Sequence, residues 1–177
     1  MLRIILTLTL LAAAVNATNV KQCKDKPFPL SVKVEGCDEP PCVVYKGNAA
    51  VMEVQFLGNN NNIQHITAKT TAKVLGLNVP YELPDEVSNV CRNLMYGAMC
   101  PIDKGEDVTY QFNFYVDPSF PEITADVTVS LDDAQGEVIS CFICSCKIRR
   151  GASAARQEYL LDWRDNQTEL KPFDTRL

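Results

Sequence analysis

A two-residue alternation of apolar and polar side chains recurs along most of this chain. Its clearest instance runs from Val108 to Val116, where every second residue is apolar and the residues between include Thr109, Gln111 and Asn113. Because successive side chains of a strand point to opposite faces, this pattern predicts a strand with one buried face. The same period occurs in residues 30–35, 52–56, 63–75, 125–131 and 138–148.

Turn-forming residues separate these segments. They include Pro40-Pro41, Lys46-Gly47-Asn48, the asparagine run after Gly58, and residues 132–136, all of which have the Gly, Pro, Asn and Asp content of turns. Short strands with one apolar face each can bury that face only against another layer. The sequence therefore predicts an all-β fold, a sandwich of two antiparallel sheets packed face to face.

The first 17 residues have the form of a secretory signal peptide. Arg3 gives a basic start, residues 4–11 are almost wholly apolar, and Val15 and Ala17 stand at the −3 and −1 positions of a cleavage site. The stretch is too short for a transmembrane helix, and a buried N-terminal helix is the alternative. We expect residues 1–17 to be removed from a secreted protein, found outside the cell or in the endosome–lysosome lumen.

The charge balance excludes one class of partner. The chain has 17 Lys and Arg against 22 Asp and Glu, a formal net charge of −5 at pH 7, and no basic cluster. Lysine and arginine supply the contacts that hold nucleic acids and anionic surfaces. We therefore expect no nucleic-acid partner.

Eight cysteines raise a separate question, which is sharpest at Cys141, Cys144 and Cys146. This cluster has the spacing of a metal–thiolate site, a redox centre or part of a disulfide framework. Cysteines of secreted chains usually pair with one another, and a zinc site needs a second ligand pair at finger-like spacing. We expect no metal site and no cofactor.

The sequence does not favour an enzyme. His65 is the only histidine, and the alternation places it on the polar face of its strand. There is no Gly-x-Ser-x-Gly motif, and the carboxylates are scattered at turns, which is the usual solvated arrangement.

Two proline-containing apolar segments stand out from the strand pattern. Residues 75–84 carry Pro80 and Pro84, and residues 116–121 carry Pro118 and Pro121. Proline removes a ladder donor, so the first segment is expected to lie along a sheet edge. Such edges either close the end of the sandwich as ordinary core or hold the sheets apart around an apolar pocket.

The order and spacing of several motifs resemble those of the ML, or lipid-recognition, domain family. The matching residues are Cys23 after the signal peptide, the tight pair in 36–42, the segment 76–84, Cys100-Pro101-Ile102 after Cys91, Tyr115-Val116 followed by Phe120-Pro121, and Cys141-Phe142. The resemblance covers roughly residues 20 to 148. It implies an immunoglobulin-like β-sandwich over residues 18–148, with a lipid held in an apolar pocket between the sheets.

The resemblance also implies site residues. The disulfides would be Cys23–Cys141, Cys37–Cys42 and Cys91–Cys100. The family's pocket positions correspond to Val79, Tyr81, Val116, Phe120 and Pro121, to which we add Phe112, Phe114 and Val129 from the apolar faces of the predicted strands. Cys144 and Cys146 would be left over. Alternation places both on one face with Phe142. If that face is inward, they are free, buried thiols. A bridge between them would be strained, since residues i and i+2 of a strand lie roughly 7 Å apart.

The function implied is that of a secreted monomeric carrier of a sterol or similar small lipid. Recognition of bacterial lipids and transport of fatty-acid-like semiochemicals are alternatives from the same family, and an adhesion-type sandwich is an alternative outside it. Leu75, Gly76 and Leu77 match a rim patch through which the family's sterol carrier reaches a membrane receptor.

The C-terminal residues 149–177 form a separate tail. Residues 152–163 have the composition for two or three helical turns, with a loosely ordered tail as the alternative. Asn166-Gln167-Thr168 is a glycosylation acceptor motif, which predicts a sugar on Asn166 and surface exposure of the tail.

Overall fold

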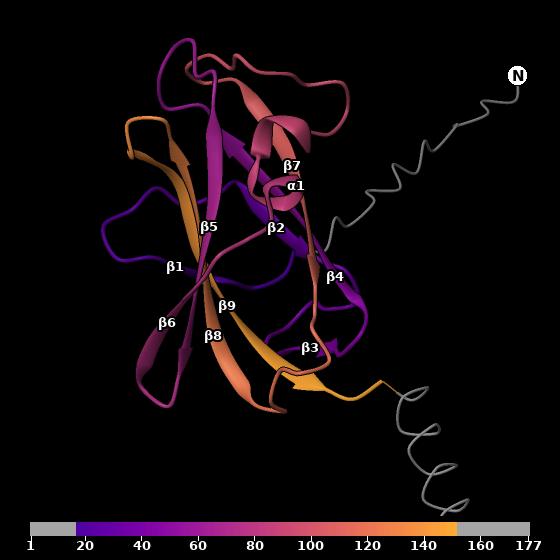
Figure 1. The fold of residues 1–177 in the computed structure, drawn as a ribbon. Helices are drawn as coiled ribbons and strands as arrows, with labels where there is room; N and C mark the ends of the chain where they lie inside the picture. Colours follow the sequence, from indigo (N-terminus) through magenta and orange to yellow (C-terminus); the bar gives the residue numbers. More distant parts are fainter. Residues whose placement is uncertain (1–16, 152–177) are drawn as a thin grey trace, which may run out of the picture.

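A computed structural model of the protein describes residues 17–151 (Figure 1). The predicted signal peptide up to residue 16, the tail from residue 152 and Asn166 lie outside these residues. The strands are β1 (Lys21–Gln22), β2 (Ser31–Val34), β3 (Cys42–Tyr45), β4 (Ala49–Leu57), β5 (Ile66–Val74), β6 (Leu77–Tyr81), β7 (Asp107–Tyr115), β8 (Thr124–Asp133) and β9 (Val138–Arg149).

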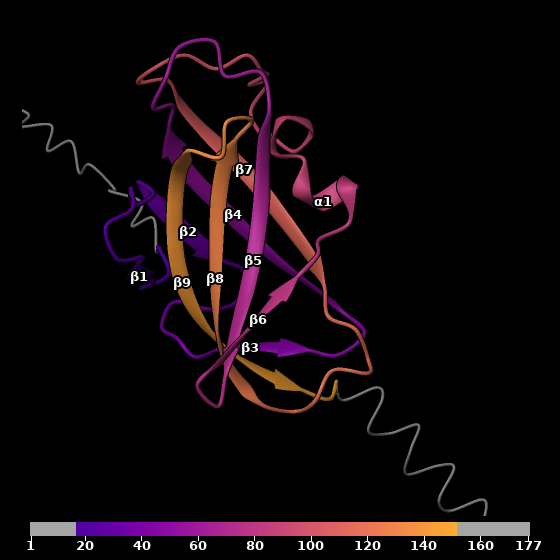
Figure 2. The same cartoon turned by 60° about the vertical axis from the view of Figure 1, so that its left-hand side comes forward.

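The strands form two layers, as the alternation predicted (Figure 1). One sheet has the order β1-β9-β8-β5-β6, and β3 also pairs with β9. The other has the order β2-β4-β7. Figure 2 shows β9, β8 and β5 side by side in front of β4 and β7, which run behind them at an angle. The fold is the predicted all-β sandwich.

One pairing departs from the antiparallel expectation. β3 runs parallel to β9, with Cys42 opposite Cys146 and Tyr45 opposite Arg149. β1 pairs antiparallel with an earlier part of the same strand, where Gln22 lies opposite Phe142. β9 is the longest strand, and its two halves therefore take different neighbours along the same edge.

The core lies between the two layers and comes from the alternating apolar positions. Its largest fully buried side chains include Phe56, Tyr110, Phe112, Phe142 and Leu131. Leu30 is an exception, since it precedes β2 and is exposed although the alternation placed it with Val32 and Val34. The predicted strand over 63–75 begins only at Ile66, because Ile63 exchanges both backbone hydrogen bonds with Ile102 instead.

A short helical segment joins β6 to β7. It consists of α1 (Asp85–Ser88) and the 3-10 helix η1 (Val90–Arg92). The buried Tyr110 hydroxyl donates a hydrogen bond of 2.5 Å to the backbone carbonyl of Val87, which fixes α1 to β7.

Within the described range, neither helix is long and apolar enough to cross a membrane.

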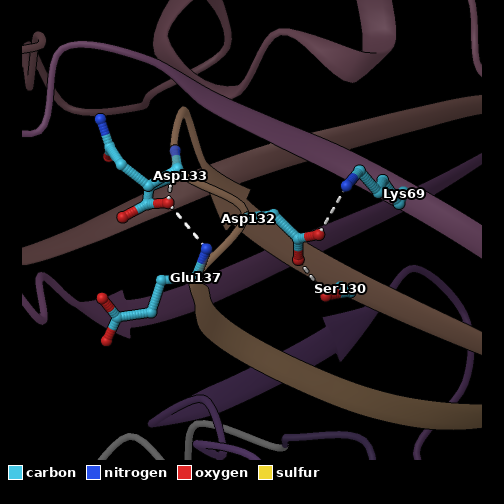
Figure 3. Close-up of polar contacts among 6 residues, drawn as sticks. Lys69, Ser130, Asp132, Asp133 and Glu137 are labelled. Atoms are coloured by element: carbon cyan, nitrogen blue, oxygen red, sulfur yellow. Dashed lines mark hydrogen bonds and ion pairs between the residues drawn. The ribbon is translucent and has the colours of Figure 1, made fainter.

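The β8–β9 hairpin corrects the expectation that its carboxylates are solvated. β8 continues through Asp132 and Asp133, and both residues are buried. Figure 3 shows Asp132 between Lys69, whose Nζ lies 2.8 Å from its Oδ2, and the Ser130 hydroxyl. Asp133 Oδ1 accepts hydrogen bonds from the backbone N–H groups of Gln135 and Glu137. Burial is tolerated because each carboxylate has charged or N–H partners.

Candidate functional site

The two proline-containing segments meet at one side of the sandwich. β6 is an edge strand that pairs with β5, which agrees with the position expected for a strand carrying Pro80. β7 is an edge strand of the three-stranded sheet and leads directly into residues 116–121. Residues far apart in the sequence therefore meet where an edge of one sheet lies against an edge of the other.

Aromatic rings occupy this meeting point. The Tyr81 ring from β6 packs edge-on against Phe114 of β7, with centroids 5.3 Å apart, and against Phe120, at 5.8 Å. Phe114 also stacks on Phe120 at 6.3 Å and on Phe112 at 6.1 Å. These spacings are those of rings in contact. We call Tyr81, Phe112, Phe114 and Phe120 the aromatic cluster.

The remaining predicted pocket residues are dispersed around this cluster. Val129 is fully buried in the main core, as is Phe112. Val116 is buried just after β7, where its N–H and C=O bond to Asn48 and Gly47. Val79 and Pro121 are exposed. The structure therefore brings three of the predicted rings into one solvent-accessible edge, with Phe112 behind them.

The rim of the cluster is acidic, but part of its charge is neutralised. Glu122 pairs with Arg150, at 2.7 Å between Oε1 and Nε, and with Arg149 at 3.9 Å. Asp117 accepts a hydrogen bond from the Ser119 N–H, and its contacts with Ser119 lower the pKa of the Asp117 carboxyl. The net result is an apolar surface with acidic residues at its border.

The β5–β6 hairpin presents apolar side chains at its tip. Leu75 is 98 % exposed and Leu77 is 71 % exposed. Leu75 and Gly76 have φ of 50° and 85°, the left-handed values of a two-residue hairpin turn. Leucine is unfavourable at such a position, so the tip combines a local conformational cost with an apolar residue directed at solvent.

The cysteines form the three bridges that the resemblance implied. Cys23 is bonded to Cys141, Cys37 to Cys42 and Cys91 to Cys100. Cys144 and Cys146 are free and buried, as expected from the inward face of β9. Sequence reasoning missed the neighbour of Cys144, since its sulfur lies 3.8 Å from that of Cys42 on β3.

A hollow that the sequence did not suggest lies on the outer face of the three-stranded sheet. It has a volume of about 570 Å³. Its lining includes Lys33, Glu53 and Gln55 from β2 and β4 and Tyr96 from the loop before β7. The positive φ of Tyr96 and Gly97 turns this loop over the sheet, and nothing in the strand pattern predicts such a turn.

Metal ligands do not gather at any point in residues 17–151. His65 lies just before β5 and is exposed.

Comparisons with known proteins agree with this geometry. A family model described as the ML domain matches residues 17–148. The mite group 2 allergen Eur m 2 of Euroglyphus maynei is 32% identical over 151 residues, covering 82% of this chain and 97% of that protein. NPC intracellular cholesterol transporter 2 of Bos taurus is 28% identical over 111 residues, covering 63% and 70%. The crystal structure of a Niemann-Pick type C2 protein from Japanese carpenter ant has the same fold, with a TM-score of 0.65 at 19% identity, covering 74% of this chain and 99% of that one. This chain belongs to the ML domain family.

Proposed function

We propose that this protein is a secreted monomeric carrier that binds a sterol or a similar small lipid between its two sheets, reached past the aromatic cluster. The observation that carries the proposal is the meeting of Tyr81, Phe114 and Phe120 where two sheet edges lie together. Membership of a family that includes a cholesterol transporter supports it.

The chemistry of the cluster suits an apolar ligand. Its rings offer faces and edges to a hydrocarbon skeleton, and Tyr81 adds one hydroxyl near the opening. Apolar surface that is removed from water when the ligand binds stabilises the complex by about 25 cal/mol per Å². Because the rings contact one another, a ligand must separate them to enter. The contacts that the ligand then makes with the rings offset the ring–ring contacts that are lost.

Two features of the site bear on how the lipid enters. Tyr81 lies on an edge strand and is 39 % exposed, so its ring can turn without disturbing a central strand. Phe120 lies in the loop between β7 and β8 rather than in a strand. The rings that close the opening are therefore the least constrained part of the cluster, whereas Phe112 is buried and fixed.

The hairpin tip supplies a contact surface for delivery. Leu75 and Leu77 are exposed at the end of the same edge strand that carries Tyr81. We assign to residues 75–77 the transient contact with a membrane or a membrane receptor, since exposed apolar patches of this kind often mark interaction sites.

The direct test is native mass spectrometry of the protein secreted by eukaryotic cells, followed by organic extraction and lipid identification. We expect a sterol or fatty acid at near-stoichiometric amount. The delipidated protein should then take up labelled cholesterol or palmitate. A protein that is empty and takes up neither probe would refute the carrier function, and uptake of lipid A alone would favour recognition of bacterial lipids.

A further inference from the structure

Four sulfur atoms lie together where β3 meets β9. Cys37 and Cys42 form a disulfide. The free thiol of Cys144 has its Sγ 3.8 Å from Cys42 Sγ, and Cys146 Sγ lies 3.9 Å from Cys144 Sγ. The parallel pairing of β3 and β9 produces this arrangement, because Cys42 lies opposite Cys146 and Cys144 is two residues earlier on the same inward face.

Contact between a thiol and a disulfide is the starting geometry for exchange. In this reaction a thiolate attacks one sulfur of the disulfide and displaces the other. Cys144 and Cys146 are the free cysteines of residues 17–151. Cys144 is in contact with the disulfide sulfur of Cys42, and Cys146 is in contact with Cys144.

The surroundings distinguish the attacking sulfur from its neighbour. The Cys146 thiol donates a hydrogen bond to Cys144, and this bond lowers the pKa of Cys144 despite its burial. The same contact, together with burial, raises the pKa of Cys146. Cys144 is therefore the more acidic of the two thiols, and it is also the one against Cys42.

The leaving group is equally well defined. Cys37 is only half-buried, in the turn between β2 and β3, whereas Cys42 is almost completely buried. A thiolate released at Cys37 can be solvated and can take up a proton. Release of Cys42 would instead leave a charge in the core, which is costly.

We propose that Cys144 exchanges with the Cys37–Cys42 disulfide, so that this domain holds an isomerisable bridge with a partly exposed thiol at Cys37 in its second form. The Cys144 thiol loses its proton, its sulfur bonds to Cys42 Sγ, and the Cys37–Cys42 bond breaks. The electron pair leaves on Cys37 Sγ, which takes up a proton. One disulfide and two thiols are present before and after, so the step needs no oxidant or reductant.

The second form differs from the first in what it connects. The Cys37–Cys42 bridge closes a turn of sequence separation 5, whereas a Cys42–Cys144 bridge would join β3 to β9 across a separation of 102. The Cys23–Cys141 bridge already links these parts of the chain, so the new bridge closes a loop much shorter than this separation but still longer than the Cys37–Cys42 turn. Closing the longer loop restricts the unfolded chain more, which is an entropic contribution in favour of the second form. The released Cys37 thiol becomes available to small disulfides such as oxidised glutathione.

The test traps the Cys37 thiol in the native full-length protein. The protein is incubated with iodoacetamide at pH 8 without reductant, then denatured, digested and mapped by mass spectrometry. We expect carbamidomethyl-Cys37 to accumulate together with a linked Cys42–Cys144 peptide pair. Because alkylation is irreversible, the product accumulates even when the second form is a minor species.

Matched variants decide whether Cys144 is responsible. Cys144→Ser should abolish alkylation of Cys37, and Cys146→Ala should slow it by about tenfold through the loss of the hydrogen bond that favours the thiolate. The Cys91–Cys100 bridge is the internal control and should stay intact throughout. It is also a short-range bridge, but its sulfurs have no such thiol contact within the described residues. Alkylation of Cys37 at the same rate in Cys144→Ser as in the natural chain would refute the proposal, as would its absence in the natural chain.

A second variant tests the geometry independently of the rate. Cys37→Ser leaves Cys42 and Cys144 as facing thiols, and oxidised glutathione should join them into a Cys42–Cys144 bridge. Recovery of this bridge in the folded variant supports the proposal. Recovery of a Cys42–Cys146 or Cys144–Cys146 bridge instead would show that the second form assigned here is wrong.

Discussion

The ring of Tyr81 on β6 meets the ring of Phe114 on β7 edge-on, with centroids 5.3 Å apart and planes at 78°. The two residues belong to different sheets, so this contact joins the layers at their shared edge. Phe120, in the loop after β7, contacts both rings. The opening proposed for lipid entry is thus closed by side chains rather than by backbone pairing.

Truncation of Tyr81 should weaken ligand binding. Tyr81→Ala removes two edge-on ring contacts, so we expect a stability loss of about 1–3 kcal/mol. The affinity for labelled cholesterol should fall by about tenfold, as the ring's contact with the ligand is lost. Tyr115→Ala is the matched control, since Tyr115 is 55 % exposed on the opposite face of β7. Equal losses of affinity in the two variants would contradict the assigned site.

The hairpin tip should affect delivery and not binding. Leu75→Asn replaces an exposed apolar residue by one that tolerates the left-handed backbone, so stability should be unchanged or slightly higher. Transfer of bound fluorescent sterol to phosphatidylcholine vesicles should slow, while the equilibrium affinity stays the same. A variant that transfers sterol as fast as the natural chain would remove residues 75–77 from the delivery surface.

The Tyr110 hydroxyl should contribute to stability through its bond to Val87. Tyr110→Phe leaves that carbonyl without its partner and should lower the free energy of unfolding by about 1–3 kcal/mol in denaturant titrations. Tyr45→Phe, at an exposed ring, should have almost no effect.

Burial of Tyr110 also predicts a pH dependence. Desolvation raises its pKa well above the ordinary phenol value of 10.0. The folded protein then keeps a proton that the unfolded chain releases, so its stability is full below pH 10 and declines as pH rises above it. Tyr110→Phe should flatten this decline in alkaline unfolding curves; an unchanged slope would show that other groups cause it.

The long-range disulfide should matter more than a short one. Cys23–Cys141 has a sequence separation of 118 and Cys91–Cys100 a separation of 9. In the chain-entropy account, losing the first costs about 5 kcal/mol and losing the second about 3 kcal/mol. Paired Ala substitutions and thermal unfolding would test the order, and a smaller loss at Cys23–Cys141 would contradict it.

Gly58 should be intolerant of any side chain. A Cβ at this position would lie 2.2 Å from the backbone oxygen of Asp103, closer than any real contact. Gly58→Ala should therefore shift the backbone and cost about 1–3 kcal/mol in chemical unfolding. Gly47→Asn is the control, because Gly47 has open space around it and a φ of +78° that asparagine accepts.

Local sequence determined the strands and their buried faces. The alternation around Phe112 and Phe142 is enough to place these side chains inward, because side-chain direction in a strand depends only on residue parity. Pro80 likewise restricted β6 to an edge, since proline has no backbone N–H to donate to a ladder. The three bridges that include Cys37, Cys91 and Cys141 came from the resemblance to the ML domain family and not from a local pattern.

Contacts between distant segments were decided only by the tertiary structure. The parallel pairing that sets Cys144 against Cys42 depends on which edge of β9 receives β3, and no local pattern encodes that choice. The burial of Asp132 depends on Lys69 from another strand. The face to which a strand residue points follows from its neighbours in the sequence, whereas the partner of each strand follows from the free energy of the whole assembled core. For this reason the sequence determined the layers, and only the tertiary structure determined the site.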